Sequence, residues 1–300
     1  MSRIAVVTDS TASIPERIIK ELNIHLVPYY IHRGEEVLLD LVTVQRETFF
    51  QWLTTAKKLP TTSNPGPGDY LTMYTKLVEE EGADGIISIH MTSKGSGAYG
   101  SATVAKSMFL ENIPNVRVEV IDTLNVSMCQ GWMVIEAAKA ALANWSLDDI
   151  IQRVRSMIPI THMVQTADTL KYLYMGGRIG KAKHLLGSIL NIKPLIGMED
   201  GIIVPLGQAR SRKKAYRMMA EMVEKTVGKD RKIDVAFVHA AALEEANKLK
   251  ATIEARLECV ETVIAELSPA LGVHTGPGTA GICFYPVLGR DKLSKNDFKR

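Results

Sequence analysis

The chain has 300 residues, of which 46% are hydrophobic and 23% charged, a composition typical of soluble globular proteins and a length that allows two domains. Its 36 basic and 33 acidic residues leave too small an excess of positive charge to predict a nucleic-acid partner or a membrane-binding surface. No signal-peptide pattern is present, and no run approaches the roughly 18 apolar residues of a membrane span. We therefore expect a cytoplasmic protein without stable membrane insertion.

Apolar runs typical of strands alternate with segments of helical period in the first half of the chain. Clear strands are expected at 3–10, 84–91 and 116–123, and two further strand-like stretches at 25–33 and 35–40. The helices are expected at 14–23, 44–56, about 68–81, 97–112 and, as an amphipathic pair, between about 127 and 157. This alternation predicts an N-terminal three-layer α/β/α domain with a mostly parallel sheet, over residues 1–160.

Strands dominate the second half of the chain. They are expected at 161–167, 192–206, 233–240, 260–267 and 279–287, and the second of these turns as a hairpin at Glu199-Asp200-Gly201. A mixed sheet is the simplest arrangement, so we predict a C-terminal α/β domain over residues 161–288. Residues 289–300 are expected to form a polar tail.

Three cysteines, Cys129, Cys259 and Cys283, lie far apart in the sequence and among apolar neighbours. Their odd number and spacing do not fit a disulfide or a metal site. They are predicted to act as small buried hydrophobic residues.

Four loops in the first half are rich in hydroxyl groups. They are Thr8-Asp9-Ser10-Thr11, the stretch TTSNPGPGDY at 61–70, Thr92–Gly97 and Asp122-Thr123. In an open parallel sheet, ligands bind beyond the carboxyl ends of the strands, and hydroxyls beside helix N-termini suit a small anion. The alternative is that these Ser and Thr residues only cap the helices that follow them.

Several chemistries lack their sequence signatures. The stretch Ser93-Lys94-Gly95-Ser96-Gly97 matches neither a phosphate-binding P-loop nor a nucleophile elbow, and no dinucleotide fingerprint follows the first strand. The spacing of His and Cys does not predict a metal site. His90, at the end of an apolar strand, is interpreted as a buried histidine with satisfied hydrogen bonds.

Two loops of the second half are also candidates for binding an anion. The first, 174–179, places Gly176 and Gly177 before Arg178, and the second, 274–281, begins with His274 and Thr275. Glycine permits close backbone approach, and His or Arg could supply a cation for an anion. A helix C-cap and a tight turn remain equally good explanations of the glycines.

Six segments together resemble the DegV family of bacterial fatty-acid-binding proteins. They are TDST at 8–11, PTTSNP at 60–65, TSKGSGAYGSA at 92–102, LKYLYMGGRIG at 170–180, LNIKPLI at 190–196 and HTGPG at 274–278. They occur in family order and span about residues 3–287. The resemblance implies two α/β domains that hold a long-chain fatty acid between them, with no cofactor.

The resemblance also implies a partner and a set of site residues. The partner is the ATP-binding subunit of a fatty acid kinase, to which the bound carboxylate is presented for phosphorylation. The carboxylate contacts carried over to this sequence are Thr62, Ser63, Ser93, Ser96, His274 and Thr275. Arg178 and Arg210 are expected to contact a phosphate or the partner.

This sequence departs from the family pattern at three places. Asn64-Pro65-Gly66 stands where Gln-Pro-Ser is common, Gly95 where Leu is common, and Ala98 where Thr is common. Two other functions stay open at this point. One is an acyl hydrolase that uses Ser96 or Ser93 with His274, and the other is a binding module for a small anionic metabolite.

Overall fold

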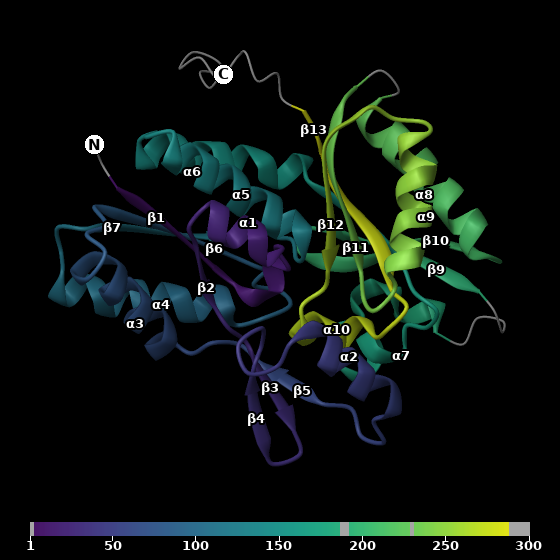
Figure 1. Ribbon diagram of the computed structural model, residues 1–300, viewed down its shortest axis with the longest axis horizontal. Helices are drawn as coiled ribbons and strands as arrows, with labels where there is room; N and C mark the ends of the chain where they lie inside the picture. The colour runs from purple at the N-terminus through teal and green to yellow at the C-terminus, as the bar shows by residue number, and fades with distance from the viewer. Residues whose placement is uncertain (1–2, 187–191, 229–230, 288–300) are drawn as a thin grey trace.

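The structure is a computed structural model, which describes residues 3–186, 192–228 and 231–287. Two layered α/β units lie side by side, with a small three-stranded sheet below the place where they meet (Figure 1). The predicted two-domain α/β fold, with a parallel and a mixed sheet, is therefore confirmed. The predicted polar tail at 289–300 lies outside the described residues.

The first unit is built on a parallel sheet with the strand order β2-β1-β6-β7. Its strands are β1 (Ile4–Asp9), β2 (Ile24–Val27), β6 (Gly85–His90) and β7 (Arg117–Asp122). The helices around it are α1 (Glu16–Glu21), α3 (Pro67–Glu79), α4 (Ala98–Asn112), α5 (Met128–Leu142) and α6 (Leu147–Met157), with the short η1 (Ser10–Ala12). Tyr74 of α3 and Phe109 of α4 pack on one face of the sheet, and Trp132 and Ile135 of α5 belong to the core on the other.

The second unit is a six-stranded mixed sheet with the order β10-β9-β8-β13-β11-β12. Its strands are β8 (His162–Thr166), β9 (Lys193–Glu199), β10 (Ile202–Ala209), β11 (Ile233–His239), β12 (Cys259–Glu266) and β13 (Ala280–Pro286). The other elements of this half are η2 (Ile158–Ile160), α7 (Lys171–Met175), η3 (Gly180–Leu185), α8 (Arg212–Val227), α9 (Leu243–Glu254) and α10 (Pro269–Thr275). Only β11 and β12 are parallel neighbours, and the predicted β9–β10 hairpin turns at Asp200 and Gly201.

The small sheet has the order β4-β3-β5 and comes from the first half of the chain. It contains β3 (Tyr30–Arg33), β4 (Glu36–Leu39) and β5 (Thr61–Ser63), and α2 (Arg46–Thr55) lies between β4 and β5. Residues 61–63 were expected to be part of a loop, and instead they pair antiparallel with β3. The prediction was wrong because this pairing partner is about thirty residues away, and local turn signals do not reveal it.

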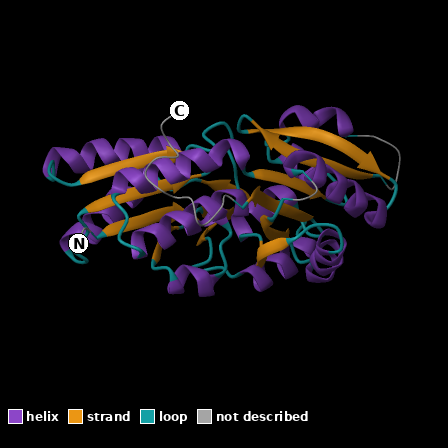
Figure 2. Ribbon diagram, turned by 90° about the horizontal axis from the view of Figure 1, so that it is seen from above, coloured by secondary structure: helices purple, strands orange, loops and turns teal. Residues whose placement is uncertain are grey.

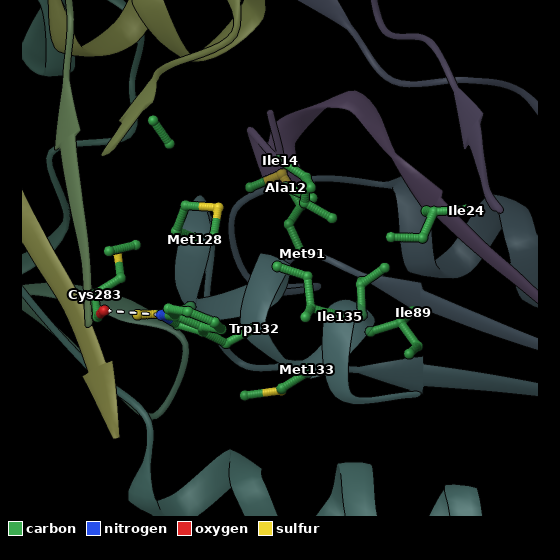
Figure 3. Close-up of a cluster of buried hydrophobic side chains, with 14 of the residues drawn as sticks. Ala12, Ile14, Ile24, Ile89, Met91, Met128, Trp132, Met133, Ile135 and Cys283 are labelled. Carbon is green, nitrogen blue, oxygen red and sulfur yellow. Dashed lines mark hydrogen bonds between the residues drawn. The ribbon is translucent and has the colours of Figure 1, made fainter. Parts of the chain in front are cut away.

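One hydrophobic core connects the two units through α5. Trp132 on this helix is fully buried and donates its indole N–H to the Cys283 carbonyl of β13 at 3.0 Å (Figure 3). Eleven residues of α5 are buried, so the helix is not the amphipathic one that the sequence predicted. The reason is that α5 packs against the parallel sheet on one side and against the mixed sheet on another. Figure 2 shows from above how helices lie on both faces of the sheets.

The cysteines behave largely as predicted. Cys129 and Cys283 are free and fully buried, whereas Cys259 is half-buried. Burial raises the pKa of the Cys129 thiol, and the neighbouring Cys283 raises it further. The Cys129 thiol is therefore a neutral side chain that packs in the core.

Candidate functional site

A cavity of about 360 Å³ is walled by residues from both halves of the chain. This volume lies in the range of small-molecule binding sites. Much of the wall is apolar, with contributions from Met91, Val126, Met163, Leu173, Ile196, Met198, Leu267 and Leu271. The polar residues of the wall include most of the predicted site: Thr62, Ser63, Ser96, Arg178, His274 and Thr275.

Thr62 and His274 are in direct contact at the wall of the cavity. The Thr62 hydroxyl lies 2.7 Å from His274 Nε2, although 212 positions separate them in the sequence. Thr62 is held by β5, which pairs Thr62 with Ile31 of β3. His274 is in the last turn of α10, so the contact connects the small sheet to the second half of the chain.

The position of α10 has identifiable causes. Ser268 caps the helix by accepting a hydrogen bond from the Leu271 N–H, and the buried carboxylate of Asp40 accepts the Ala270 N–H at 3.2 Å. Gly272 lies against Phe50 of α2, where a Cβ atom would come within 2.6 Å of the ring. The small sheet and α2 therefore fix the helix that carries His274.

His274 is a neutral imidazole near pH 7. Burial, and to a smaller extent the positive charge of Arg178, lower its pKa to about 4. Its Nδ1 is buried without a partner among the described residues. A Cβ on Gly176 would lie 2.2 Å from that nitrogen, so the glycine is what leaves room for the ring.

Ser96 pairs with Tyr29, a residue that the sequence analysis missed. The Tyr29 hydroxyl and Ser96 Oγ are 2.6 Å apart, and both residues line the cavity. Burial raises the pKa of Tyr29 well above its ordinary value, so the phenol keeps its proton. Tyr29 directly follows Pro28 at the carboxyl end of β2, and this position beyond a parallel strand is a signal that could have identified it.

Arg178 connects two loops at the same end of the cavity. Its Nε donates to the Gly95 carbonyl at 3.4 Å and its Nη1 to the Gly176 carbonyl at 2.7 Å. The charge of Arg178 acts on the pKa values of both His274 and Tyr29. We call Thr62, Ser96, Tyr29, His274 and Arg178 the head cluster.

The other predicted residues occupy different positions. Ser63 lines the cavity, but strand alternation turns its hydroxyl to His32 Nε2 at 2.8 Å. Thr275 donates its hydroxyl to the Leu271 carbonyl at 3.1 Å and also lines the cavity. Ser93 and Arg210 are exposed and do not line it.

The Thr8–Thr11 loop is mostly internal structure. Thr8 Oγ1 donates to the Ile89 carbonyl, Ser10 Oγ accepts the Tyr29 N–H at 3.0 Å, and Asp9 contacts His90 Nδ1 at 3.0 Å. His90 is fully buried and also bonds Ser88, which confirms the interpretation of a satisfied core histidine. This loop therefore helps to hold Tyr29 in place through the Ser10 hydroxyl. Of its four residues, only Thr11 lines the cavity.

The capping alternative fails for Thr62 and Ser63. They lie on β5, and the helix that follows begins at Pro67 with Gly66 as its N-cap. Ser96 Oγ does accept the Ala98 N–H at 3.4 Å, at the start of α4, so this hydroxyl serves both the helix and Tyr29.

Comparison with known proteins places the chain in a family. A model of the DegV family of uncharacterised proteins matches residues 3–287. This chain belongs to the DegV family. A DegV domain-containing protein of Caldanaerobacter subterraneus is 33% identical over 95% of this chain and 99% of its own length.

Two solved DegV family structures have the same fold. A fatty-acid-binding DegV family protein from Thermus thermophilus aligns with a TM-score of 0.88 and 30% identity, over 95% of this chain and all of its own. DegV from Bacillus subtilis, a fatty acid binding protein, aligns with a TM-score of 0.82 and 31% identity, over 96% of this chain and all of its own.

Metal-binding clusters and membrane-spanning helices were also sought in this DegV family member. No group of three or more His, Cys, Asp or Glu side chains within 3–186, 192–228 and 231–287 is placed to hold a metal ion. Over the same ranges, no helix has the length and apolar character required to cross a membrane.

Proposed function

We propose that the cavity binds a long-chain fatty acid and that the head cluster holds its carboxylate. The observation that carries the proposal is the Thr62–His274 contact, which places polar groups at the wall of a largely apolar cavity in a chain about 30% identical to fatty-acid-binding DegV proteins. Such an arrangement suits a ligand with one polar end and a long apolar tail.

The tail supplies most of the affinity in this proposal. Burying one methylene group is worth about 0.8 kcal/mol, so a chain of roughly fifteen methylenes gains about 12 kcal/mol before the costs of ordering. Methionine side chains adapt to irregular shapes, and Met91, Met163 and Met198 all contribute to the wall.

The head cluster fixes the orientation of the ligand. A neutral His274 with its proton on Nε2 donates to Thr62 Oγ1, which frees the Thr62 O–H to donate to the carboxylate. The protonated Tyr29 does the same for Ser96, whose hydroxyl also faces the cavity. Arg178 adds a positive charge beside both pairs, which favours the ionised acid.

A bound acid held in this way can serve as the substrate of another protein. We propose that the carboxylate is presented to the ATP-binding subunit of a fatty acid kinase in the cytoplasm, and that this chain alone is a carrier and not an enzyme. The exposed Arg178 and Arg210 are available to contact a phosphate or the partner. The chain has no phosphate-cradling glycine loop of its own.

The hydrolase alternative receives no support from the geometry. The ring nitrogen of His274 that makes a contact bonds Thr62, and the hydroxyl of Ser96 bonds Tyr29. Nucleophilic catalysis needs a serine within hydrogen-bond reach of the base, and neither Ser93 nor Ser96 has this relation to His274.

The test is to purify the protein, extract it with organic solvent and analyse the extract by mass spectrometry. We expect close to one long-chain fatty acid per chain. With ATP, the protein alone should leave the nucleotide intact, and addition of a compatible kinase subunit should yield acyl phosphate. Bound nucleotide or sugar phosphate in place of lipid, or ATP turnover by the isolated chain, would contradict the proposal.

A further inference from the structure

Besides the head cluster, the cavity wall includes further polar side chains, most of which have hydrogen-bond partners, as Thr11 has in Asp9 and Thr92 in the Gly201 carbonyl. Two others, Ser127 and Gln165, differ in this respect. Ser127 and Gln165 both line the cavity and are 1% and 4% exposed, respectively. They come from different elements, since Ser127 immediately precedes α5 and Gln165 lies on β8. A purely apolar tail offers neither of them a hydrogen-bond partner.

Ser127 has a hydroxyl without a partner. It is the N-cap residue of α5, yet its side chain accepts no N–H from the first turn, and its Oγ has no hydrogen bond among the described residues. Its backbone has φ 58 and ψ −148, which is an unfavourable conformation for a residue with a Cβ. The Ser127 hydroxyl therefore contributes no hydrogen bond to the start of α5.

Gln165 is also unusual for its position. It faces the same side of the mixed sheet as Met163, and the neighbouring strand β13 places Gly281 directly opposite, where a Cβ would lie 2.4 Å from Gln165 Cγ. The other inward residues of β13, Cys283 and Tyr285, belong to the hydrophobic core around α5. No described residue forms a hydrogen bond with the side-chain amide of Gln165.

The charge around the cavity decides which kind of group these two residues could bind. Among the described residues of the wall, the only Lys and Arg are Lys94 and Arg178, and both belong to the loops around Ser96 and Gly176. A second carboxylate at Ser127 and Gln165 would be buried without a cation, which is costly. A neutral oxygen, as in a hydroxyl or keto group, can accept from both side chains, and a hydroxyl can also donate to Gln165.

We propose, building on the function proposed above, that the preferred ligand is an oxygenated fatty acid, whose chain carries a hydroxyl or keto group that Ser127 and Gln165 bind. Among the described residues, the Ser127 hydroxyl and the Gln165 amide lack partners, and both residues belong to the largely apolar wall of one cavity. A plain saturated acid leaves these groups unsatisfied, so it binds more weakly than an acid of the same length that satisfies them.

The test is a competition assay in which stearic acid and a set of hydroxystearic acids, differing in the carbon that bears the hydroxyl, displace a fluorescent fatty acid from the delipidated protein. We expect at least one isomer to bind about tenfold more tightly than stearic acid, the effect of one well-placed buried hydrogen bond. Ser127→Ala and Gln165→Leu should each remove this preference while leaving the affinity for stearic acid unchanged or higher.

Thr166→Val is the matched control. Thr166 follows Gln165 on β8, is buried, has an unpartnered hydroxyl and does not line the cavity, so its replacement should not change the preference. If stearic acid binds and no isomer binds more tightly, or if Ser127→Ala weakens both ligands equally, the oxygenated-ligand proposal is wrong while fatty acid binding stands. If neither stearic acid nor any isomer binds, both proposals fail.

Discussion

Thr62 connects distant parts of the chain at the wall of the cavity. Its Oγ1 lies 2.7 Å from His274 Nε2. In the proposed tautomer, Nε2 carries the proton and donates to Thr62, which leaves the hydroxyl proton free for a carboxylate. Ser96 has the equivalent relation to Tyr29. The two pairs give the proposed head site two hydroxyl donors, each oriented by an uncharged partner behind it.

Removing one head contact should impair orientation more than affinity. We expect His274→Ala and Ser96→Ala to weaken fatty acid binding by about 1–3 kcal/mol, because the apolar tail still supplies most of the affinity. Acyl phosphate formation with a kinase subunit should fall much further, since transfer requires the carboxylate in one orientation. Both quantities are measured on the same preparations, by lipid titration and by product analysis.

Ser93→Ala is the comparison for this experiment. Ser93 is exposed and its side chain does not line the cavity, so the substitution should leave transfer near the wild-type level. A loss for Ser93→Ala as large as that for Ser96→Ala would show that the carboxylate lies at Ser93, as the family resemblance also allowed.

The sequence predicts the place of the candidate site better than its individual residues. The hydroxyl loops indicate where on the sheet a ligand would bind, because they follow parallel strands. They do not indicate which hydroxyl points inward: Ser96 lines the cavity and Ser93 does not, although both belong to one short loop. Tyr29 was missed because an aromatic residue after a strand is usually part of the core.

Among the elements, β5 and α5 differ most from their predictions. The hydroxyls of residues 61–63 are positioned by pairing with β3, a long-range contact that short-range turn signals do not reveal. Helix α5 packs against two sheets and is therefore buried on several sides. The hydrophobic period of its own sequence does not reveal this tertiary packing. The remaining strands and the helices of the first half follow local hydrophobic periods and lie near their predicted positions.

The turn after α7 gives a prediction at the level of elements. Gly176 has an ordinary backbone conformation, so Gly176→Ala adds only a methyl group, aimed at His274 Nδ1. We expect the ring to shift, the Thr62 contact to break and acyl phosphate formation to fall by an amount similar to His274→Ala. The product assay would measure the loss of acyl phosphate formation, and the NMR signals of the His274 ring would detect its shift.

Gly177→Ala is the control for that change. Gly177 has φ 71, and a Cβ there would meet nothing within 4 Å. The substitution should cost about 1 kcal/mol in the free energy of unfolding through backbone strain, while the product assay remains unaffected. If Gly177→Ala impaired transfer as much as Gly176→Ala, the effect would come from the loop as a whole and not from contact with His274.

At the scale of the whole molecule, stability should depend on the buried neutral histidine of the site. The pKa of His274 is lowered to about 4 by burial and by Arg178, against an ordinary value of 6.5. The unfolded chain therefore binds this proton more readily. The resulting contribution to stability is complete above about pH 6.5 and is lost as the pH falls toward 4.

We expect His274→Gln to flatten this dependence. Between pH 7 and pH 4.5, the wild type should lose up to about 2–3 kcal/mol more of its free energy of unfolding than the variant does, as measured by urea titration. Asp40, whose pKa burial raises to about 6, acts in the opposite direction, but it is present in both proteins and cancels in the difference. Parallel curves for the two proteins would mean that the pKa of His274 is the same in the folded and the unfolded chain.

The Trp132 indole suggests a practical use of the continuous core. Fully buried, it donates a hydrogen bond from α5 to the Cys283 carbonyl of the opposite sheet. Indole emission shifts with the polarity around the ring, and the other two tryptophans, Trp52 and Trp145, are only partly buried. A protein that retains just Trp132 would therefore report, by its fluorescence spectrum, whether the α5–β13 junction separates when lipid enters or leaves.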